Sequence, residues 1–188
     1  MHTLIRRLRM KVYQGYLFLG LIVTVSIGNY CFAGKAVNQL VEQARKAAPL
    51  AISEQASIVV NGKTVVQGSN GWTCMPQSVP GSGAMCNDGV WQEMMMAIAN
   101  KKDFKTDGIG ISYMLLGDPE GAGVSNSDPY HPNPKQANDY VEEGPHLMIL
   151  VPKELLKGIT DDPKSGGPYV MWKDTPYAHI MVPVTSEE

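Results

Sequence analysis

Residues 144–152, GPHLMILVP, form an unbroken apolar segment behind a Gly-Pro pair, and residues 178–184, AHIMVPV, repeat its His-x-Met pattern. Short apolar segments bounded by glycine and proline are typical of β-strands. Because side chains alternate across a strand, His146 and Met148 are expected to share one face of the first strand. The histidine and methionine of the second segment are expected to do the same. The opposite faces of both strands are aliphatic and are expected to pack against helices.

The rest of the chain supplies further strands. Residues 57–67, SIVVNGKTVVQ, place two β-branched runs around Asn61-Gly62, a dipeptide that fits the type I′ turn of a β-hairpin. Short segments of similar character are interpreted as two more strands, residues 109–116 and 169–172, and the second His-x-Met strand is taken as residues 177–184. Hairpin-like connections between most of these segments predict an antiparallel sheet.

Two helices are predicted to flank this sheet. Residues 35–48 repeat apolar side chains at helical spacing before Pro49, and a second helix is expected after Asn87, which can cap it. Residues 117–139 are rich in proline, glycine and asparagine and are predicted to be a loop. The sequence therefore predicts a single α+β domain, with a mostly antiparallel sheet of five or six short strands and two flanking helices.

Residues 1–33 have the pattern of a secretory signal peptide. A basic segment precedes an apolar run that ends in compact residues before Ala33, after which cleavage is predicted. Residues 34–56 are then an N-terminal helix and linker, and residues 57–188 are the α+β domain. This pattern predicts a periplasmic or secreted protein. The uncharged stretch of 20 residues over 15–34 is also about long enough to span a bilayer, so an uncleaved membrane anchor is the alternative.

The charge distribution argues against some partners. Residues 1–33 hold four of the 16 basic side chains and none of the 18 acidic ones, so the remaining chain has 12 basic and 18 acidic residues and a formal charge of −6. A nucleic-acid-binding surface needs a cluster of lysine and arginine, and the sequence has none. Neither nucleic acid nor, after cleavage of the signal peptide, a membrane is an expected partner.

Cys74 and Cys86 remain after removal of the signal peptide. An even number of cysteines in an oxidising compartment predicts a disulfide, which would stabilise so short a loop by roughly 3 kcal/mol. A redox or metal-binding thiol pair is the alternative. The eleven intervening residues match neither a C-x-x-C motif nor a zinc knuckle, so the spacing favours the structural disulfide.

The two His-x-Met strands suggest a metal site. If they are neighbours, four side chains stand at the corners of a rectangle of roughly 5 by 7 Å: His146, Met148, His179 and Met181. Imidazole and thioether form a soft ligand set that suits copper as Cu(I), and the need for neutral imidazole predicts weaker binding below about pH 6. Met171 can add a further thioether. The alternatives are core packing of the same side chains and catalytic histidines.

Several aromatic residues lie near glycine-rich turns. They offer the walls of a pocket for a small apolar or sugar-like ligand: Trp72, Tyr113, Tyr169, Trp172 and Tyr177. Packing in the core is the alternative for the same side chains.

Several sequence blocks are similar to those of a known group of proteins. The blocks are NGWTCMP, MCNDGVW, GPHLMI and SGGPYVMWKDTPYAHIMVPV, within residues 57–184. They resemble a family of uncharacterised exported bacterial proteins that has no assigned activity. The resemblance therefore implies a shared fold and export, and it supplies no catalytic residue.

These observations favour an exported binding protein without catalytic activity, with a copper-type His/Met site as the most concrete hypothesis. The chain contains no G-x-S-x-G, H-E-x-x-H, P-loop or dinucleotide fingerprint. One alternative is a hydrolase-like enzyme with His146 or His179 as general base. Another is a structural or interaction protein without a small ligand.

Overall fold

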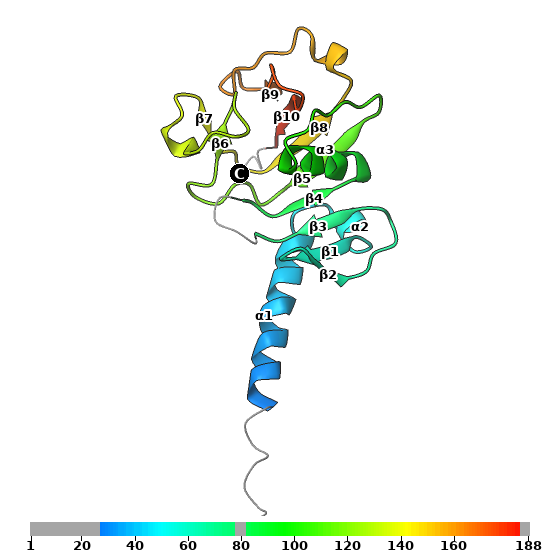
Figure 1. Cartoon of the computed structure of the whole chain (residues 1–188). Helices are drawn as coiled ribbons and strands as arrows, with labels where there is room; N and C mark the ends of the chain where they lie inside the picture. Colours follow the sequence, from blue (N-terminus) through cyan, green and yellow to red (C-terminus); the bar gives the residue numbers. More distant parts are fainter. Residues whose placement is uncertain (1–26, 78–81, 185–188) are drawn as a thin grey trace, which may run out of the picture.

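A computed structural model describes residues 27–77 and 82–184. Its centre is an eight-stranded sheet with the order β2-β1-β3-β4-β5-β8-β10-β9 (Figure 1). All ladders of this sheet are antiparallel except β1–β3. The α+β class and the mostly antiparallel sheet are confirmed, whereas the expected five or six strands are too few.

The strands of the large sheet are β1 (Ser57–Val60), β2 (Lys63–Val66), β3 (Thr73–Met75), β4 (Met85–Asn87), β5 (Gly110–Met114), β8 (His146–Leu150), β9 (Tyr169–Met171) and β10 (His179–Pro183). A second, two-stranded sheet consists of β6 (Val124–Ser125) and β7 (Tyr140–Val141). The helices are α1 (Ile27–Arg45), α2 (Leu50–Ser53) and α3 (Gly89–Ala99), with short 3-10 turns η1 (Pro134–Gln136) and η2 (Lys153–Leu156).

The β1–β2 hairpin forms as the sequence predicts. Asn61 has φ 50° and Gly62 has φ 73°, and a type I′ turn requires positive φ at both central residues. On its other side β1 pairs with β3, which carries the first cysteine of the disulfide.

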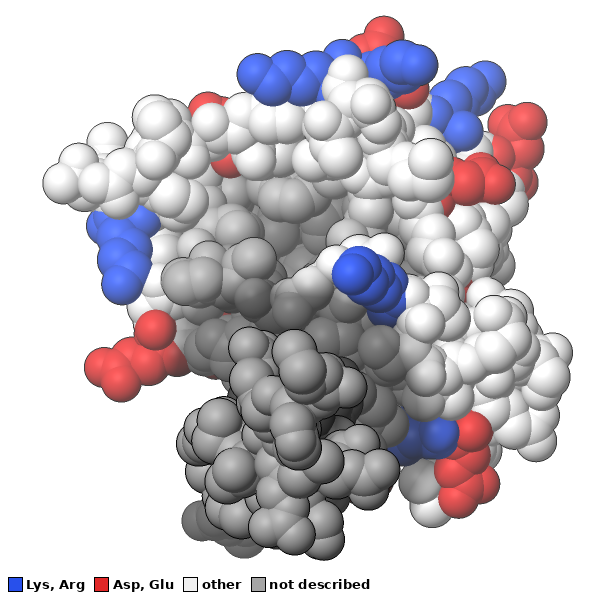
Figure 2. All heavy atoms as spheres, turned by 60° about the horizontal axis from the view of Figure 1, so that its bottom comes forward, with Lys and Arg blue, Asp and Glu red and all other residues white. Residues whose placement is uncertain are grey.

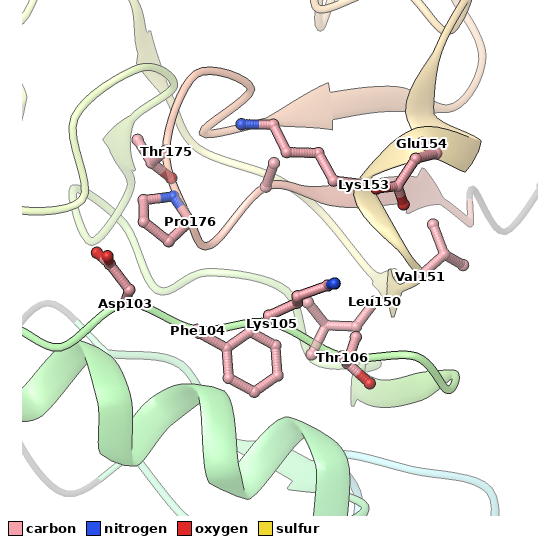
Figure 3. A pocket seen from close by; sticks show the side chains of 11 residues that line it. Asp103, Phe104, Lys105, Thr106, Leu150, Val151, Lys153, Glu154, Thr175 and Pro176 are labelled. Atoms are coloured by element: carbon pink, nitrogen blue, oxygen red, sulfur yellow. The ribbon is translucent and has the colours of Figure 1, made fainter.

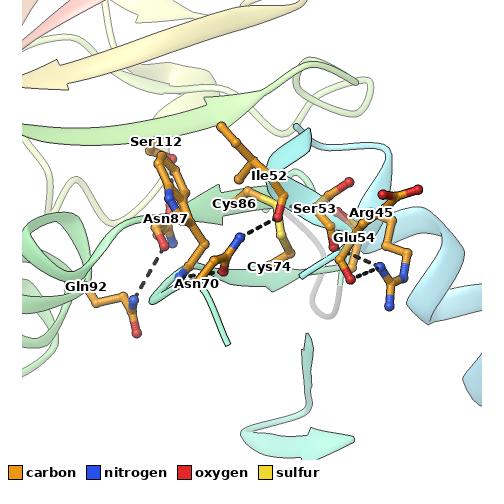
Figure 4. Close-up of a disulfide and its surroundings, with 12 residues drawn as sticks. Arg45, Ile52, Ser53, Glu54, Asn70, Cys74, Cys86, Asn87, Gln92 and Ser112 are labelled. Carbon is orange, nitrogen blue, oxygen red and sulfur yellow. Dashed lines mark hydrogen bonds between the residues drawn. A yellow bond between two sulfur atoms is a disulfide. The ribbon is translucent and has the colours of Figure 1, made fainter. Parts of the chain in front are cut away.

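Cys74 and Cys86 lie directly opposite each other on β3 and β4 and form the predicted disulfide (Figure 4). Both are fully buried. Sequence analysis missed these two strands because each has only three residues and the segment between them is rich in proline and glycine. The disulfide therefore joins neighbouring strands within one layer of the fold.

The C-terminal part of α1 packs on the face of the sheet that contains the disulfide. Ala44 and Ala47 are fully buried there with Ile58, while the N-terminal part of the helix projects away from the sheet (Figure 1). The helix runs through the predicted cleavage position after Ala33, and residues 1–26 of the predicted signal peptide lie outside the described residues. Among the described helices, none combines the length and apolar character needed to cross a membrane.

Helix α3 lies across the opposite face of the sheet. Its N-cap is Asp88, one residue after the predicted Asn87: Oδ1 of Asp88 accepts a hydrogen bond from the backbone N–H of Trp91 at 2.8 Å. Oδ2 of Asp88 accepts another from the N–H of Ile111 at 2.7 Å, which ties the helix to β5. Asn87 is buried instead and accepts a hydrogen bond from Oγ of Ser112 at 2.6 Å.

Candidate functional site

Strands β8 and β10 are neighbours, as the site hypothesis requires. Met148 lies opposite Met181, but His146 lies opposite Pro183. On its other side β10 pairs with β9, where His179 lies opposite Met171. The expected four-cornered arrangement is therefore wrong in register: the two histidines stand at opposite ends of the row, with the methionine pair between them.

His179 is the most unusual polar residue of this face. Its ring is 1% exposed, and its Nδ1 lies 2.9 Å from the carbonyl oxygen of Tyr177. A carbonyl oxygen can only accept a hydrogen bond, so Nδ1 carries the proton and Nε2 presents a lone pair. Nε2 is buried and has no hydrogen-bond partner among the described residues. Burial lowers the pKa of His179 from 6.5 to about 4, so the imidazole is neutral at ordinary pH.

Two indoles flank this imidazole. Trp91 of α3 meets the His179 ring edge to face at a centroid distance of 5.2 Å, and Trp172 does the same at 5.1 Å. Trp91 is 3% exposed, whereas Trp172 is only partly buried. The aromatic rings and the surrounding core thus separate the lone pair of Nε2 from water.

The backbone of Trp172 holds a left-handed conformation with φ 55°, which is rare for a bulky side chain. Two hydrogen bonds hold it there. The backbone N–H donates to the carbonyl oxygen of Asn126 at 2.7 Å, and Nε1–H donates to that of Ser125 at 2.9 Å. Strain of this kind persists only where the surroundings fix the residue, and it often marks a functional site. The small β6–β7 sheet is the part of the fold that fixes Trp172.

Methionines supply much of the core beside His179. Five buried methionines belong to the same cluster as Trp91: Met94, Met114, Met148, Met171 and Met181. Met171 is the direct cross-strand neighbour of His179, and Met181 lies two residues further along β10 on the same face. Thioether sulfur is a soft ligand, so imidazole and soft donors come from neighbouring positions of one sheet face.

His146 has a different environment. It is 1% exposed, and its Nδ1 donates to the carbonyl oxygen of Gly144 at 2.7 Å. Burial raises the pKa of the nearby Asp118 carboxyl, while the backbone N–H of Glu143 and the proximity of His146 oppose the rise. A general base must reach its substrate, and both histidine rings are buried. The geometry therefore does not support the hydrolase alternative.

The five aromatic residues expected to line a pocket are divided between two faces of the sheet. Trp72 and Tyr113 form a tilted pair at 5.7 Å on the face of α1. Tyr169 and Tyr177 are buried in the cluster beneath α3, and Trp172 packs on His179. These five side chains therefore pack in two clusters on opposite faces of the sheet and do not line one common pocket.

A pocket of about 290 Å³ lies elsewhere, at the end of the sheet where β8 stops and β10 begins (Figure 3). It is lined by residues 103–106 after α3, by the end of β8 with the start of η2, and by the segment before β10. None of the five expected aromatic residues lines it. Sequence reasoning missed it because its walls come from three separate loops.

The surface charges do not gather by sign on the face shown in Figure 2, where basic and acidic side chains are interspersed. Within residues 27–77 and 82–184, no group of three or more histidine, cysteine, aspartate or glutamate side chains is placed to hold a metal ion. The ligand set available beside His179 is made of thioethers.

No match to this chain is found among protein-family models, curated proteins or solved structures. The resemblance to exported bacterial proteins stays a prediction.

Proposed function

We propose that this is an exported binding protein that holds a soft metal ion such as Cu(I) at His179, with thioether ligands from Met171 and Met181. The observation that carries the proposal is the buried Nε2 of His179, which has no hydrogen-bond partner within residues 27–77 and 82–184. A buried polar atom without a partner destabilises a fold by about 1–3 kcal/mol. A coordinate bond to this lone pair would offset that loss.

The orientation of the ring supports this proposal. Metal-binding histidines usually donate their second N–H to a carbonyl or carboxylate oxygen, which fixes the tautomer and aims the other nitrogen. Here Nδ1–H donates to the carbonyl oxygen of Tyr177, so Nε2 is the coordinating atom. The neutral state of the buried imidazole is the one that a metal ligand requires.

The pairing of β9 with β10 favours two methionines as the thioether ligands. Directly opposed side chains have Cβ atoms about 5 Å apart, and positions two residues along a strand are about 7 Å apart. Met171 and Met181 hold these two positions relative to His179. Of the residues predicted from the sequence, Met148 lies opposite Met181 in β8, and His146 lies opposite Pro183, four residues along β10 from His179. Met171 takes the place of His146 in the proposed set.

Export is supported by two features that are independent of the site. The disulfide Cys74–Cys86 is of a kind that forms and persists in oxidising compartments. The N-terminal sequence has the pattern that predicts a signal peptide. Together they favour a periplasmic or secreted location.

Anaerobic competition against a Cu(I) chelator tests the site. The wild-type protein is expected to bind one Cu(I). Met171→Leu conserves the side-chain volume but removes the sulfur, and it should weaken binding roughly tenfold or more. The matched control is Met114→Leu, because Met114 is also buried on this face but lies beside His146. This control is expected to bind Cu(I) like the wild type.

A second readout identifies the ligands without relying on affinity. X-ray absorption of the Cu(I) complex is expected to show sulfur and nitrogen in the first coordination shell, and Met171→Leu should reduce the sulfur signal. Urea unfolding of both leucine variants checks that the fold is retained. Equal affinities of the wild type, Met171→Leu and a folded His179→Phe variant would remove the proposal.

A further inference from the structure

The pocket at the end of the sheet has an apolar interior. The side chains come from the α3–β5 connection, from the end of β8 and from the segment before β10 (Figure 3): Phe104, Leu150, Val151, Pro176 and Ala178. Leu150 and Ala178 are buried members of the fold, so the base of the pocket is built on the sheet itself. A volume of about 290 Å³ lies just below the usual range for ligand pockets, roughly 300–1,000 Å³, and therefore fits only a small molecule.

Charged side chains of both signs surround this apolar interior. Lys105 and Lys153 are exposed cations on opposite sides of the pocket, and Asp103 and Glu154 are exposed anions beside them (Figure 3). In the part of the chain that the structure describes, the ion pair that forms is Lys173–Asp161, outside the pocket. The four charges around the pocket therefore have no ion-pair partner among the described residues.

We propose that this pocket binds a small zwitterion with an apolar side group, as in a free apolar α-amino acid such as leucine or phenylalanine. The apolar interior takes the side group. The ligand carboxylate pairs with a lysine, and its ammonium group pairs with an acidic side chain. A ligand with only one charge would satisfy one sign and face the like-charged side chains unpaired, so charge complementarity favours the zwitterion.

This inference concerns a site distinct from the proposed metal ligands. The pocket residues include neither His179 nor a methionine, although Ala178 is the neighbour of His179 in sequence. Failure of copper binding would leave the pocket proposal intact, and failure of amino-acid binding would leave the copper proposal intact.

Calorimetric titration of the purified full chain with L-phenylalanine and L-leucine tests the ligand class. Three comparison compounds each remove one feature. 3-Phenylpropanoate lacks the ammonium group, 2-phenylethylamine lacks the carboxylate, and glycine lacks the apolar side group. We expect saturable binding of both amino acids, with each comparison compound weaker by roughly tenfold or more. ¹⁵N-detected shifts at the amides of Phe104 and Ala178 should follow the same order.

Two matched pairs of variants locate the site. Lys153→Gln is expected to weaken phenylalanine binding by roughly tenfold, whereas Lys157→Gln, an exposed lysine of the same segment outside the pocket, should leave it unchanged. Asp103→Asn, in the pocket, is likewise expected to weaken phenylalanine binding, whereas Asp107→Asn, outside the pocket, should leave it unchanged. All four positions are exposed, so their folding stability should match that of the wild type.

Three results would overturn the proposal. The first is absence of saturable binding of both amino acids. The second is 3-phenylpropanoate or 2-phenylethylamine binding as tightly as phenylalanine, which would show that one charge suffices. The third is equal affinity of Lys153→Gln and Lys157→Gln, with amide shifts away from Phe104 and Ala178, which would place binding elsewhere on the protein.

Discussion

The indole of Trp172 meets the imidazole of His179 edge to face, with ring centroids 5.1 Å apart and an interplanar angle of 81°. Trp172 reaches this position from a left-handed backbone conformation with φ 55°. Side chains other than glycine are disfavoured there by roughly 1–2 kcal/mol. The contact with His179 and the hydrogen bonds to the β6–β7 sheet outweigh this strain.

At position 172, a glycine variant should be more stable than an alanine variant, which is the reverse of the usual order of stability. Both Trp172→Ala and Trp172→Gly lose the ring and are expected to lower the free energy of unfolding by about 3 kcal/mol. Glycine adopts positive φ without strain, so Trp172→Gly should be more stable than Trp172→Ala by about 1 kcal/mol. Urea denaturation measures both. Met171 lies in the regular part of β9, so Met171→Ala should be more stable than Met171→Gly. If Trp172→Ala were also more stable than Trp172→Gly, the strain at Trp172 would be contradicted.

Stability of the metal-free protein should depend on pH through His179. Burial lowers the pKa of His179 from 6.5 to about 4. Between these values the unfolded chain binds a proton that the folded protein excludes, so stability falls as the pH falls from about 6.5 to about 4. The loss amounts to about 3 kcal/mol at 1.36 kcal/mol per unit. Above pH 6.5 this group contributes no pH dependence.

Urea unfolding across this pH range, on the wild type and on His179→Phe, isolates the contribution of His179. The free energy of unfolding of the variant should change less with pH, because the variant lacks the buried imidazole. The difference between the two curves then reports the titration of His179. His131→Gln serves as a control, since His131 lies in a loop and is partly exposed. Parallel curves for the wild type and His179→Phe would refute a buried neutral His179.

The disulfide is expected to be a large contributor to stability. Replacing both Cys74 and Cys86 with alanine should lower the free energy of unfolding by roughly 2–5 kcal/mol. Both sulfur atoms are buried beneath α1, so a reductant should act only after unfolding. Thiol trapping during a urea titration with reductant measures this, and release of thiols well before the unfolding transition would contradict it.

The buried pair Asn87–Ser112 links β4 to β5 beneath α3. Oγ of Ser112 donates to Oδ1 of Asn87 at 2.6 Å, and both residues are fully buried. Ser112→Ala leaves the amide oxygen of Asn87 without this donor and should destabilise the protein by about 1–3 kcal/mol. A double-mutant cycle with Asn87→Ala is expected to show coupling between the two residues. Strict additivity in urea denaturation would show that the hydrogen bond contributes nothing beyond the single side chains.

Much of the fold follows from local patterns that the sequence displays. Asn61-Gly62 predicts its hairpin because both residues accept positive φ, and the apolar segments of β8 and β10 are long enough to be recognised. The strands β3 and β4 escaped recognition because three residues carry too little periodicity. Their cross-strand disulfide is a signal that was available, since a short loop closed by two cysteines favours paired flanking strands.

The site was predictable only in part, because strand register is a property of the assembled sheet. The sequence shows that His179 and Met181 share a face, but it does not show which residue of β9 stands opposite His179. In the structure Met171 is the residue of β9 that lies opposite His179, and Trp172, with φ 55°, begins the turn that follows β9. Burial also lowers the pKa of His179 to about 4, so protons would compete with a metal at the proposed site near pH 4 and not near pH 6.

Strand β10 follows β9 along the chain but lies between β9 and β8 in the sheet. Among the described strands, β9 pairs only with β10, and the N–H of Val170 donates instead to the carbonyl oxygen of Thr160 at 2.7 Å. The β9 amides that face β10 can therefore be shielded from hydrogen exchange only while β10 is in place. During synthesis, β8 keeps an open edge until β10 has emerged. A chain interrupted before His179 would present that edge to other polypeptides.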